Sequence, residues 1–405
     1  MFEGPSVVHI HMRIIHVLAN LSAAAGGPPK AALGMAQGLA RRGHDVAIYT
    51  TNFDGDADAD VPLDTPLDTG GVAVRYYQVG SPRFWKPSAA LGRALDRAVP
   101  EADIVHIHSL YLYHDLAAAR ACRRSGVPYV VRPHGTLDPY IWRRHRWRKR
   151  LIEWWYMNRV LEDAAAIHYT SEDERRLAAP YARNPRAIVV GNGIDPADFE
   201  ALPPGGRFRA MHPEIGDRPI VLFLGRLNFK KGLDLLAPAF GRVLAAGHDA
   251  HLVIAGPDEG MADKTRGWLA DAGALDRTTF TGMIDGEERL AALADAAMFV
   301  LPSYSENFGI AVAEAMFCRL PVVITDKVNI WEEVRDAGAG LVSGCDVEEV
   351  AAGIAALLAD PGRGRAMGEA GRALVLGRYS WDGIAPQLEK AYEDIIAGRI
   401  GGGRT

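Results

Sequence analysis

The sequence predicts an α/β fold made of two Rossmann-like domains with parallel sheets. Short apolar runs typical of buried strands alternate with helical patterns, and this alternation indicates a parallel sheet covered by helices. The alternation stops at a polar stretch with several Pro and Gly residues, 196–218, and then starts again. The chain has 405 residues, which is enough for two hydrophobic cores.

The first half of the chain is expected to form one sheet with covering helices. The expected strands are 13–18, 45–50, 104–108, 129–132, 166–169 and a sixth that begins at 188 and runs into a turn at 191–195. The expected helices are 29–41, 112–125, 147–162 and 171–179. We expect residues 12–198 to form the first domain, preceded by a short extension.

The second half repeats the pattern. The expected strands are 220–224, 251–255, 279–281, 298–301, 321–325 and 340–342, with helices between them up to about residue 376. A break at 379–382 precedes a last helix, and we expect 380–397 to return to the first domain and 199–378 to form the second. Open α/β sheets bind ligands at the carboxyl ends of their strands. We therefore expect a site in a cleft between two facing domains.

Composition excludes several classes of protein. The net charge of -5 and the pI near 6.2 provide no general basis for binding nucleic acid. Three cysteines, an odd number without paired spacing, indicate neither a disulfide framework nor a zinc site: Cys122, Cys318 and Cys345. No apolar run of about 18 residues predicts a membrane-spanning helix, and the opening residues lack the features of a signal peptide. A cytoplasmic location is expected.

The segment 300–316 carries the most specific signal. A strand-like run ends at Pro302, a polar turn follows, and a helical pattern begins near Phe308. Glu306 and Glu314 lie eight residues apart, or roughly 12 Å along a helix, which matches the reach from a sugar across a diphosphate to a ribose. The helix start between them favours an anion. An ordinary turn carboxylate and a helix glutamate with a surface partner would explain the two glutamates alone equally well.

A second strand end carries two cations. Arg226 follows the strand 220–224, and Lys231 lies where a helical pattern begins. A diphosphate leaving group that is not served by a metal ion needs such cations. Taken alone, these residues would fit a surface basic cluster at least as well.

Two further features of the first half suggest ligand contacts. Gly26 and Gly27 lie between the first strand and a helix, where glycine lets the backbone approach a phosphate, although a plain tight turn would look the same. His134 follows the strand 129–132 and is expected to project into the cleft. A lone histidine is more often structural than catalytic, so the neighbouring residues must decide between these roles.

Two other patterns are interpreted as structural. The run from Asp54 to Asp60 resembles a calcium loop, but Ala59 and Thr65 occupy the positions that need Gly and Glu, so a solvated loop is expected. His106 and His108 lie on one strand, and we expect them to point to opposite sides, with at most one of them reaching any given site. They are interpreted as structural or cleft-rim residues.

The motifs together resemble those of the family 4 retaining glycosyltransferases, whose fold is GT-B, over essentially all of residues 12–397. The matching elements are Gly26-Gly27-Pro28, His134-Gly135, Gly191-Asn192-Gly193-Ile194-Asp195, Gly225-Arg226 with Lys231-Gly232, and Glu306 with Glu314, in the order of the family. The resemblance implies an acceptor-side first domain, a second domain that binds the nucleotide sugar, and retention of anomeric configuration.

The resemblance also implies roles for individual residues. Those expected at the reaction centre are His134 on a donor-sugar hydroxyl, Glu306 on the sugar hydroxyls, and Arg226 and Lys231 on the diphosphate. The other expected donor contacts are Gly26, Gly27, Met283 near the base, the backbone of Asn307, Phe308, Gly309 and Ile310, and Glu314 on the ribose. No metal and no other cofactor are expected.

The function expected from these features is transfer of a hexose from a UDP- or GDP-sugar to a saccharide or lipid-linked glycan. Two alternatives remain: a nucleotide-sugar 2-epimerase of the same fold, and a non-catalytic protein that binds nucleotide sugars. The sequence disfavours dinucleotide oxidoreduction, because no G-x-G-x-x-G motif follows the first strand.

One segment suggests a membrane partner. Residues 142–155 interleave arginine and lysine with four tryptophans. Basic helices rich in aromatic residues bind the interface of anionic membranes, so peripheral docking on the inner face of a membrane is expected. A helix that buries its tryptophans and solvates its arginines is the alternative.

Overall fold

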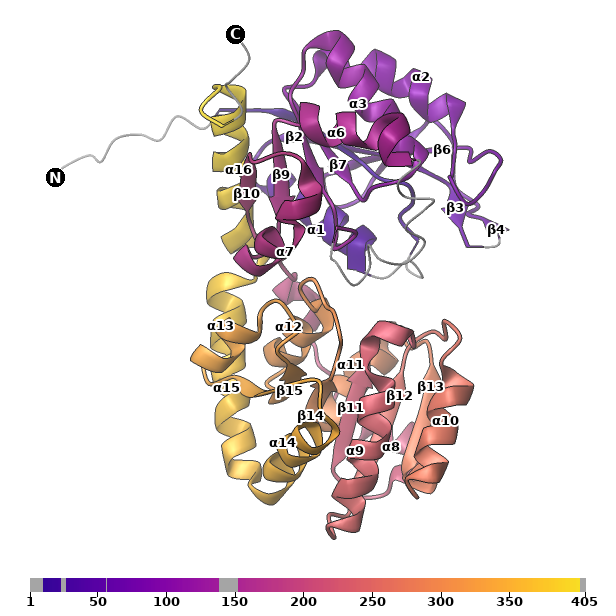
Figure 1. Cartoon of the computed structure of the whole chain (residues 1–405), viewed down its shortest axis with the longest axis vertical. Coiled ribbons are helices and arrows are strands. Elements are labelled where there is room, and N and C mark those ends of the chain that lie inside the picture. Colours follow the sequence, from indigo (N-terminus) through magenta and orange to yellow (C-terminus); the bar gives the residue numbers. More distant parts are fainter. Residues whose placement is uncertain (1–9, 23–26, 56, 138–151, 401–405) are drawn as a thin grey trace, which may run out of the picture. The chain divides into compact units, whose positions relative to one another are not determined.

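The computed structural model describes residues 10–22, 27–55, 57–137 and 152–400. These residues form two compact units, each with its own parallel sheet (Figure 1). The first unit comprises Met1–Gly191 and Ile384–Thr405, and the second comprises Asn192–Gly383. The chain therefore leaves the first unit once and returns to it with the second part of its last helix.

The sheet of the first unit has eight strands in the order β10-β9-β8-β7-β1-β2-β6-β5, and only β5 runs antiparallel to its neighbour. The strands are β1 Arg13–Val17, β2 Asp45–Thr51, β5 Pro66–Asp68, β6 Ala73–Tyr77, β7 Ile104–His108, β8 Tyr129–Arg132, β9 Ala166–Tyr169 and β10 Ala187–Val189. A small hairpin, β3 Phe53–Asp54 with β4 Ala57–Asp58, lies outside this sheet. The sequence did not predict the edge strand β5 or its neighbour β6, because both strands are only partly buried and lack a continuous apolar run.

The described helices of the first unit follow the predicted pattern, with one addition, and residues 147–151 of the predicted helix 147–162 lie outside the described part of the chain. They are α1 Gly27–Arg41, α2 Ala89–Ala98, α3 Tyr113–Ser125, α6 Asn158–Asp163, α7 Glu172–Ala182 and α16 Trp381–Ile396. A π-helical turn, Glu153–Met157, leads into α6. The sequence did not predict α2, whose start is fixed by Ser88, a side chain that accepts a hydrogen bond from the Leu91 amide.

The last helix is anchored in the first unit by buried polar contacts. The Tyr392 hydroxyl lies 2.6 Å from Nδ1 of His106, and both side chains are fully buried. Glu389 of the same helix pairs with Arg42 and lies 3.6 Å from Nε2 of His44. These contacts join the last helix to β7 and to the turn between α1 and β2, so the first unit is discontinuous in sequence.

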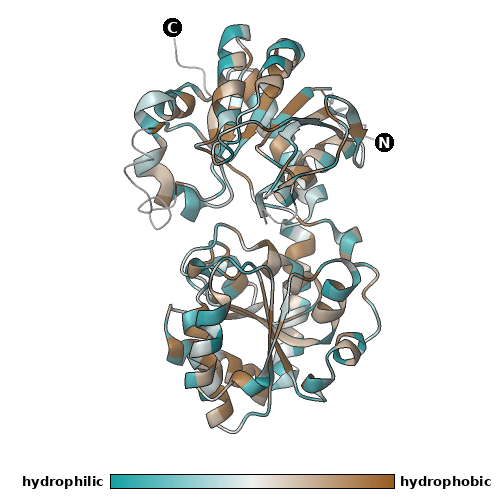
Figure 2. Ribbon diagram, turned by 90° about the vertical axis from the view of Figure 1, so that its right-hand side faces the viewer, coloured by the Kyte–Doolittle hydropathy of each residue, from teal (hydrophilic) through white to brown (hydrophobic). Residues whose placement is uncertain are grey.

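The second unit is a doubly wound sheet of six parallel strands. Its order is β13-β12-β11-β14-β15-β16, formed by β11 Ile220–Leu224, β12 His251–Ala255, β13 Thr278–Gly282, β14 Ala296–Leu301, β15 Val322–Thr325 and β16 Gly340–Ser343. Its helices are α8 Arg207–Met211, α9 Leu233–Ala245, α10 Ala262–Asp271, α11 Gly286–Asp295, α12 Ile310–Phe317, α13 Trp331–Asp336, α14 Val347–Ala359 and α15 Pro361–Arg378. The central strands are hydrophobic (Figure 2), because helices cover both faces of a doubly wound sheet.

The predicted linker 196–218 is wrong, since this segment is folded into the second unit. It contains two 3₁₀ turns, Pro196–Phe199 and Pro213–Ile215, with α8 between them. Phe199, Phe208 and Ile215 are buried in the core of the unit. The burial of these residues could not be predicted from the sequence, because single apolar residues in a polar segment produce no periodic pattern.

The two segments that cross between the units run side by side. The Ile194 amide donates to the Tyr379 carbonyl at 2.7 Å, and the Trp381 amide donates to the Ile194 carbonyl at 3.1 Å. A Cβ on Gly193 would lie 2.6 Å from Cδ2 of Trp381 and 2.8 Å from its backbone nitrogen. Gly193 is therefore needed for the two segments to pair.

We predict that Gly193→Ala destabilises the protein by about 1–3 kcal/mol, because the added methyl group forces the paired segments apart. Gly267→Ala is the matched control: Gly267 lies within α10, and a Cβ there would meet nothing within 4 Å. The control should be neutral or slightly stabilising, because alanine favours a helix interior. Chemical denaturation measures both variants, and equal stability of the two would contradict the steric argument.

Candidate functional site

The second unit has a switch point at the carboxyl ends of β11 and β14. From β11 the chain proceeds to β12 and β13 on one side of the sheet, and later returns to β14 on the other side. Ligands of doubly wound sheets bind outside the carboxyl ends of the strands at such a point. The loops that follow these two strands, 225–232 and 302–309, contain half of the predicted site residues: Arg226, Lys231, Glu306, Asn307, Phe308 and Gly309.

The backbones of these two loops are in tight contact. Gly232 has a φ of +66°, and a Cβ there would lie 1.9 Å from the carbonyl oxygen of Pro302, so no side chain fits. The Tyr304 amide donates to the Lys230 carbonyl at 2.8 Å, and the Tyr304 hydroxyl donates to Asp234 at 2.9 Å. The two loops therefore have a defined position relative to each other before any ligand binds.

This contact brings Lys231 and Glu306 together as an ion pair. The two side chains are only 12% and 15% exposed, and the Lys231 ammonium donates to the Glu306 carboxylate. Burial alone would raise the pKa of Glu306, but Lys231, Lys230 and Arg226 together lower this pKa to about 2. The structure thus unites two residues that the sequence assigned to the phosphate and to the sugar.

Arg226 has a carboxylate partner that the sequence did not predict. Its guanidinium donates to Glu259 at 2.6 Å, and Asn228 donates to the other oxygen of the same carboxylate at 2.9 Å. Glu259 lies in the loop after β12, on the same rim of the sheet as Arg226. In the sequence, only the place of Glu259 directly after a strand indicated that it could lie at the site. A glutamate in a polar loop is otherwise too common to be informative.

The turn after Glu306 leads into the start of α12. Phe308 is buried, and its ring packs edge-on against Tyr379 with centroids 5.1 Å apart, so its side chain belongs to the core. Gly309 has a φ of +77° and caps α12, which begins at Ile310. The first N–H groups of a helix have no partner within the helix and favour an anion. Only the backbone of this turn, together with the half-buried Asn307, is suited to ligand contact.

Glu314 is buried and already paired in the second turn of α12. Its carboxylate accepts a hydrogen bond from Arg289 of α11, and its side chain is only 3% exposed. Burial lowers the pKa of Arg289. The sequence did not single out Arg289, which lies in an ordinary amphipathic helix. A ribose contact by Glu314 remains a prediction, and a ribose would have to share this carboxylate with Arg289.

Met283 lies on the rim of the same sheet. It follows β13 and is 50% exposed. The carbonyl of the preceding residue, Gly282, accepts a hydrogen bond from the Gly256 amide at 2.7 Å. The structure therefore places Met283 beside the loop that carries Glu259. Its contact with a nucleobase remains a prediction.

In the first unit, His134 occupies an unusual backbone conformation directly after β8. Its φ is +52°, in the left-handed region that residues other than glycine rarely adopt and that costs roughly 1–3 kcal/mol. The adjacent Gly135 amide donates to Glu174 at 3.3 Å, which helps hold the turn. Such strain is concentrated at functional sites. Gly27 is the first residue of α1, and Gly26 lies outside the described residues.

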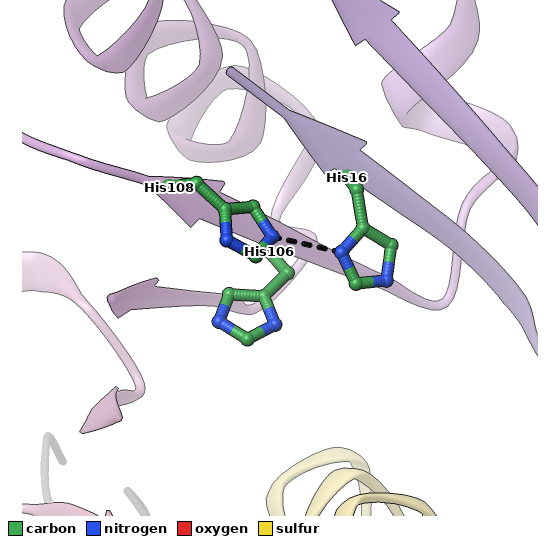
Figure 3. Close-up of side chains that lie close together, drawn as sticks. All are labelled: His16, His106 and His108. Carbon is green, nitrogen blue, oxygen red and sulfur yellow. Dashed lines mark hydrogen bonds between the residues drawn. The ribbon is translucent and has the colours of Figure 1, made fainter. Parts of the chain in front are cut away.

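His106 and His108 point to the same side of β7, so the prediction of opposite sides is wrong (Figure 3). Residues i and i+2 of a strand share a face, and these two rings stack with centroids 4.4 Å apart. His16 of β1 lies beside both of them, and His168 of β9 lies beside His106. Neighbouring strands thus bring four buried histidines together, and His134 adjoins them through His108.

The histidine cluster is connected by hydrogen bonds. Nitrogens of His16, His106 and His108 all lie within 4.8 Å of one another, close enough for a metal ion to be considered. However, His16 Nδ1 and His108 Nε2 are 2.8 Å apart, which is a hydrogen-bond distance. Both ring nitrogens of His106 also have partners, Tyr392 at 2.6 Å and His168 at 3.3 Å. These distances fit a network of shared protons better than a set of metal ligands.

The histidines of this cluster are neutral near pH 7. Burial, with the charge of Arg132, lowers the pKa of His16 to about 3. The same two causes lower the pKa of His134, and burial is also the main cause that lowers the pKa values of His106 and His108. Burial lowers the pKa of Arg132 to about 10, so that side chain stays charged.

The aspartate-rich segment forms the hairpin β3–β4. Asp58 accepts hydrogen bonds from Arg83 at 2.6 Å and from Gln78 at 2.7 Å, and Arg83 also donates to the carbonyls of Gly55 and Ala57. These contacts give this loop an evident structural role.

Two family models match the chain, one in each half. Residues 25–198 match the model described as Glycosyltransferase Family 4, and residues 207–374 match Glycosyl transferases group 1. The two matches together cover the second sheet, the first sheet except β1, and the loops described above.

Known proteins resemble the chain over most of its length. An uncharacterized glycosyltransferase of Methanocaldococcus jannaschii is 26% identical over 89% of this chain and 92% of its own length. The alpha-maltose-1-phosphate synthase of Mycolicibacterium smegmatis is 30% identical over 73% of this chain and 80% of its own. The crystal structure of Anabaena HepE with UDP-glucose superposes with a TM-score of 0.74 at 18% identity, covering 95% of this chain and all of HepE. This likeness shows that the fold is GT-B.

We predict a specific acid sensitivity from the Lys231–Glu306 pair. The folded pKa of Glu306, about 2, lies below its ordinary value of 4.5, so the ionised carboxylate contributes stability that is complete above about pH 4.5 and is lost as the pH falls towards 2. The loss can reach about 3 kcal/mol. Urea denaturation at stepped pH should show this component in the parent protein and not in Glu306→Gln. The same pH dependence of the free energy of unfolding in both proteins would contradict this prediction.

Proposed function

The chain belongs to glycosyltransferase family 4, and on this premise we propose that it transfers a hexose from a UDP- or GDP-sugar to a saccharide or lipid-linked glycan acceptor with retention of configuration. The observation that carries the proposal is the buried Lys231–Glu306 pair at the switch point of the second unit, with Arg226 beside it. A product of this kind serves polysaccharide or glycoconjugate synthesis.

The ion pairs of the second unit support a role in binding a diphosphate. In the free protein, Lys231 is held by Glu306 and Arg226 by Glu259. Both cations thus have a counter-charge in the free protein, and for Lys231, which is mostly buried, the absence of a counter-charge would be costly. A diphosphate can exchange with the carboxylates as the partner of these cations, and no metal ion is then needed to offset its charge.

The proposed reaction assigns a further task to each side chain. The bond between the anomeric carbon and the diphosphate oxygen breaks, and Lys231 and Arg226 stabilise the negative charge that develops on the leaving group. The acceptor hydroxyl attacks the anomeric carbon from the face that the leaving group vacates and gives its proton to the leaving phosphate. Glu306 accepts hydrogen bonds from sugar hydroxyls, and the proposed role of His134 is a hydrogen bond with a hydroxyl of the donor sugar.

A ligand screen tests the proposed donor class. The melting temperature of the full chain is measured with UDP, GDP, ADP and their sugars, because a bound ligand raises apparent stability. Stabilisation by one nucleotide series identifies the base, and stabilisation by none would overturn the proposal.

A product analysis tests the proposed reaction. The anomeric configuration of the product, read by proton NMR, should equal that of the donor. An inverted product would refute the retaining mechanism. Consumption of the donor without an acceptor, with formation of a C2 epimer, would favour the epimerase.

We predict that Lys231→Ala weakens both nucleotide affinity and turnover, whereas Glu306→Ala lowers turnover more than affinity. Loss of the lysine removes a charge-assisted contact to the phosphates, worth about tenfold or more in the dissociation constant. Loss of the glutamate removes hydrogen bonds to the sugar and leaves Lys231 free for the phosphates.

Calorimetry with the nucleoside diphosphate and steady-state kinetics separate these two effects. Lys264→Ala, an exposed lysine of α10, is the matched control and should behave as the parent protein. Equal nucleotide affinity of Lys231→Ala and the parent would contradict the phosphate role.

We further propose that the segment 142–155 docks on an anionic membrane, which would suit a lipid-linked acceptor. Residues 142–151 lie outside the described part of the chain, but Trp154 and Trp155 are 82% and 56% exposed. Exposed tryptophans next to a basic segment are typical of proteins that bind the membrane interface. Among the described helices, none is long and apolar enough to cross a membrane.

We predict that the protein co-sediments with vesicles of phosphatidylcholine and phosphatidylserine, and that charge reversal at Arg144, Arg148 and Lys149 abolishes this binding, because the attraction is electrostatic. Vesicles of phosphatidylcholine alone are the control. Equal sedimentation of the parent and the variant would remove the proposal.

A further inference from the structure

We propose that His108, with His16 behind it, is a positioning residue that holds His134 in its Nδ1–H tautomer, so that His134 donates a hydrogen bond to the sugar. The role towards the sugar rests on the proposed function. The tautomer itself is a property of the free protein and can be measured without a ligand.

The geometry is a chain of three imidazoles that ends at His134. His16 Nδ1 lies 2.8 Å from His108 Nε2, and His108 Nδ1 lies 3.0 Å from His134 Nε2. Each of these two contacts joins nitrogens only, so one nitrogen of each pair carries a proton and the other accepts it. The protonation of one ring therefore decides that of the next.

Each ring of this chain carries one ring proton. His16 and His108 are buried and His134 is half-buried, and desolvation together with the nearby positive charge of Arg132 lowers the pKa values of all three imidazoles, that of His16 to about 3. A neutral imidazole has one N–H group and one bare nitrogen. Two polarities are then available: the N–H groups can all point outward from His16 to His134, or all point inward.

The inner end of the chain selects the outward polarity. His16 Nε2 is buried, and no described residue forms a hydrogen bond with it. The inward polarity would place an N–H group at this position, and a buried donor without a partner is rare and unfavourable. With the outward polarity, His16 donates to His108 and His108 donates to His134 Nε2. The proton of His134 is then on Nδ1.

The outward polarity makes His134 a donor towards a ligand. No described residue forms a hydrogen bond with His134 Nδ1, and the residue is only half-buried and directly follows the sheet. A neutral donor at this place fits a hydroxyl oxygen of a sugar. His134 is held in a left-handed turn, with a φ of +52°.

A second chain on the same sheet serves as an internal comparison. His168 Nε2 lies 2.8 Å from the Val190 carbonyl, which can only accept, so His168 Nδ1 is bare and accepts from His106 Nε2. His106 Nδ1 then accepts from the Tyr392 hydroxyl at 2.6 Å. Both ends of this chain are closed by protein groups, so it has no route to His134.

The tautomers are tested by nitrogen NMR of the full chain with ¹⁵N-labelled histidine. Long-range proton–nitrogen spectra distinguish N–H from bare ring nitrogens, and His134→Gln assigns the signal of His134. We expect His134 to have a protonated Nδ1 and a bare Nε2 in the ligand-free parent protein. A protonated Nε2 would overturn the proposal, and the tautomer itself is read in the parent protein, with the variant used for assignment alone.

Two substitutions of His108 test the coupling. In His108→Asn the side-chain amide can still donate to His134 Nε2, whereas His108→Leu has no donor. We expect His108→Leu to abolish the preference of His134 for the Nδ1–H tautomer. The same variant should lower kcat/KM about tenfold, as for the loss of one hydrogen bond. The kcat/KM of His108→Asn should stay within about threefold of the parent value.

His106→Asn is the matched control, because this residue lies on the same strand and face but belongs to the other chain of histidines. It should leave the tautomer of His134 unchanged. An unchanged tautomer in His108→Leu would refute the relay. Absence of any sugar transfer by the parent protein would refute the proposed function instead, and the NMR result would remain valid.

Discussion

The close approach of Gly232 to the Pro302 carbonyl is the contact on which the second unit's site depends. The missing side chain lets the loop after β11 lie directly on the loop after β14, and two hydrogen bonds of Tyr304 hold them there. Only then do Lys231 and Glu306, 75 residues apart in sequence, meet as a buried pair. A preformed pair keeps the cation in place before the ligand arrives, which reduces the reorganisation that binding requires.

The polar side chains of the two units are stabilised in different ways. In the second unit, each strong charge of the site has a counter-charge: Lys231 with Glu306, Arg226 with Glu259, and Arg289 with Glu314. In the first unit, burial beside Arg132 keeps a cluster of histidines uncharged, and they share protons through hydrogen bonds. A charged ligand can exchange with the carboxylates of the second unit, whereas the first unit offers neutral hydrogen-bonding groups.

Secondary structure was predictable wherever a strand is buried on both faces. The strands 104–108, 129–132, 166–169, 220–224 and 251–255 have the predicted bounds, because central strands of parallel sheets are continuous apolar runs. The edge strand β5 and its neighbour β6 were missed because they are partly exposed, and the segment 196–218 was misjudged because isolated residues such as Phe208 anchor it. In both cases burial is decided by distant parts of the chain.

The sequence by itself determined the family, the fold class and the strand ends at which the site residues lie, because these features are local patterns in a recurring order. Only the tertiary structure decided which side chains meet. It paired Arg226 with Glu259 and Glu314 with Arg289, and it joined His134 to His108 and His16 across neighbouring strands. The physical reason is that partners and protonation states depend on distance and burial, and these are set by strand order and by single backbone contacts such as that of Gly232.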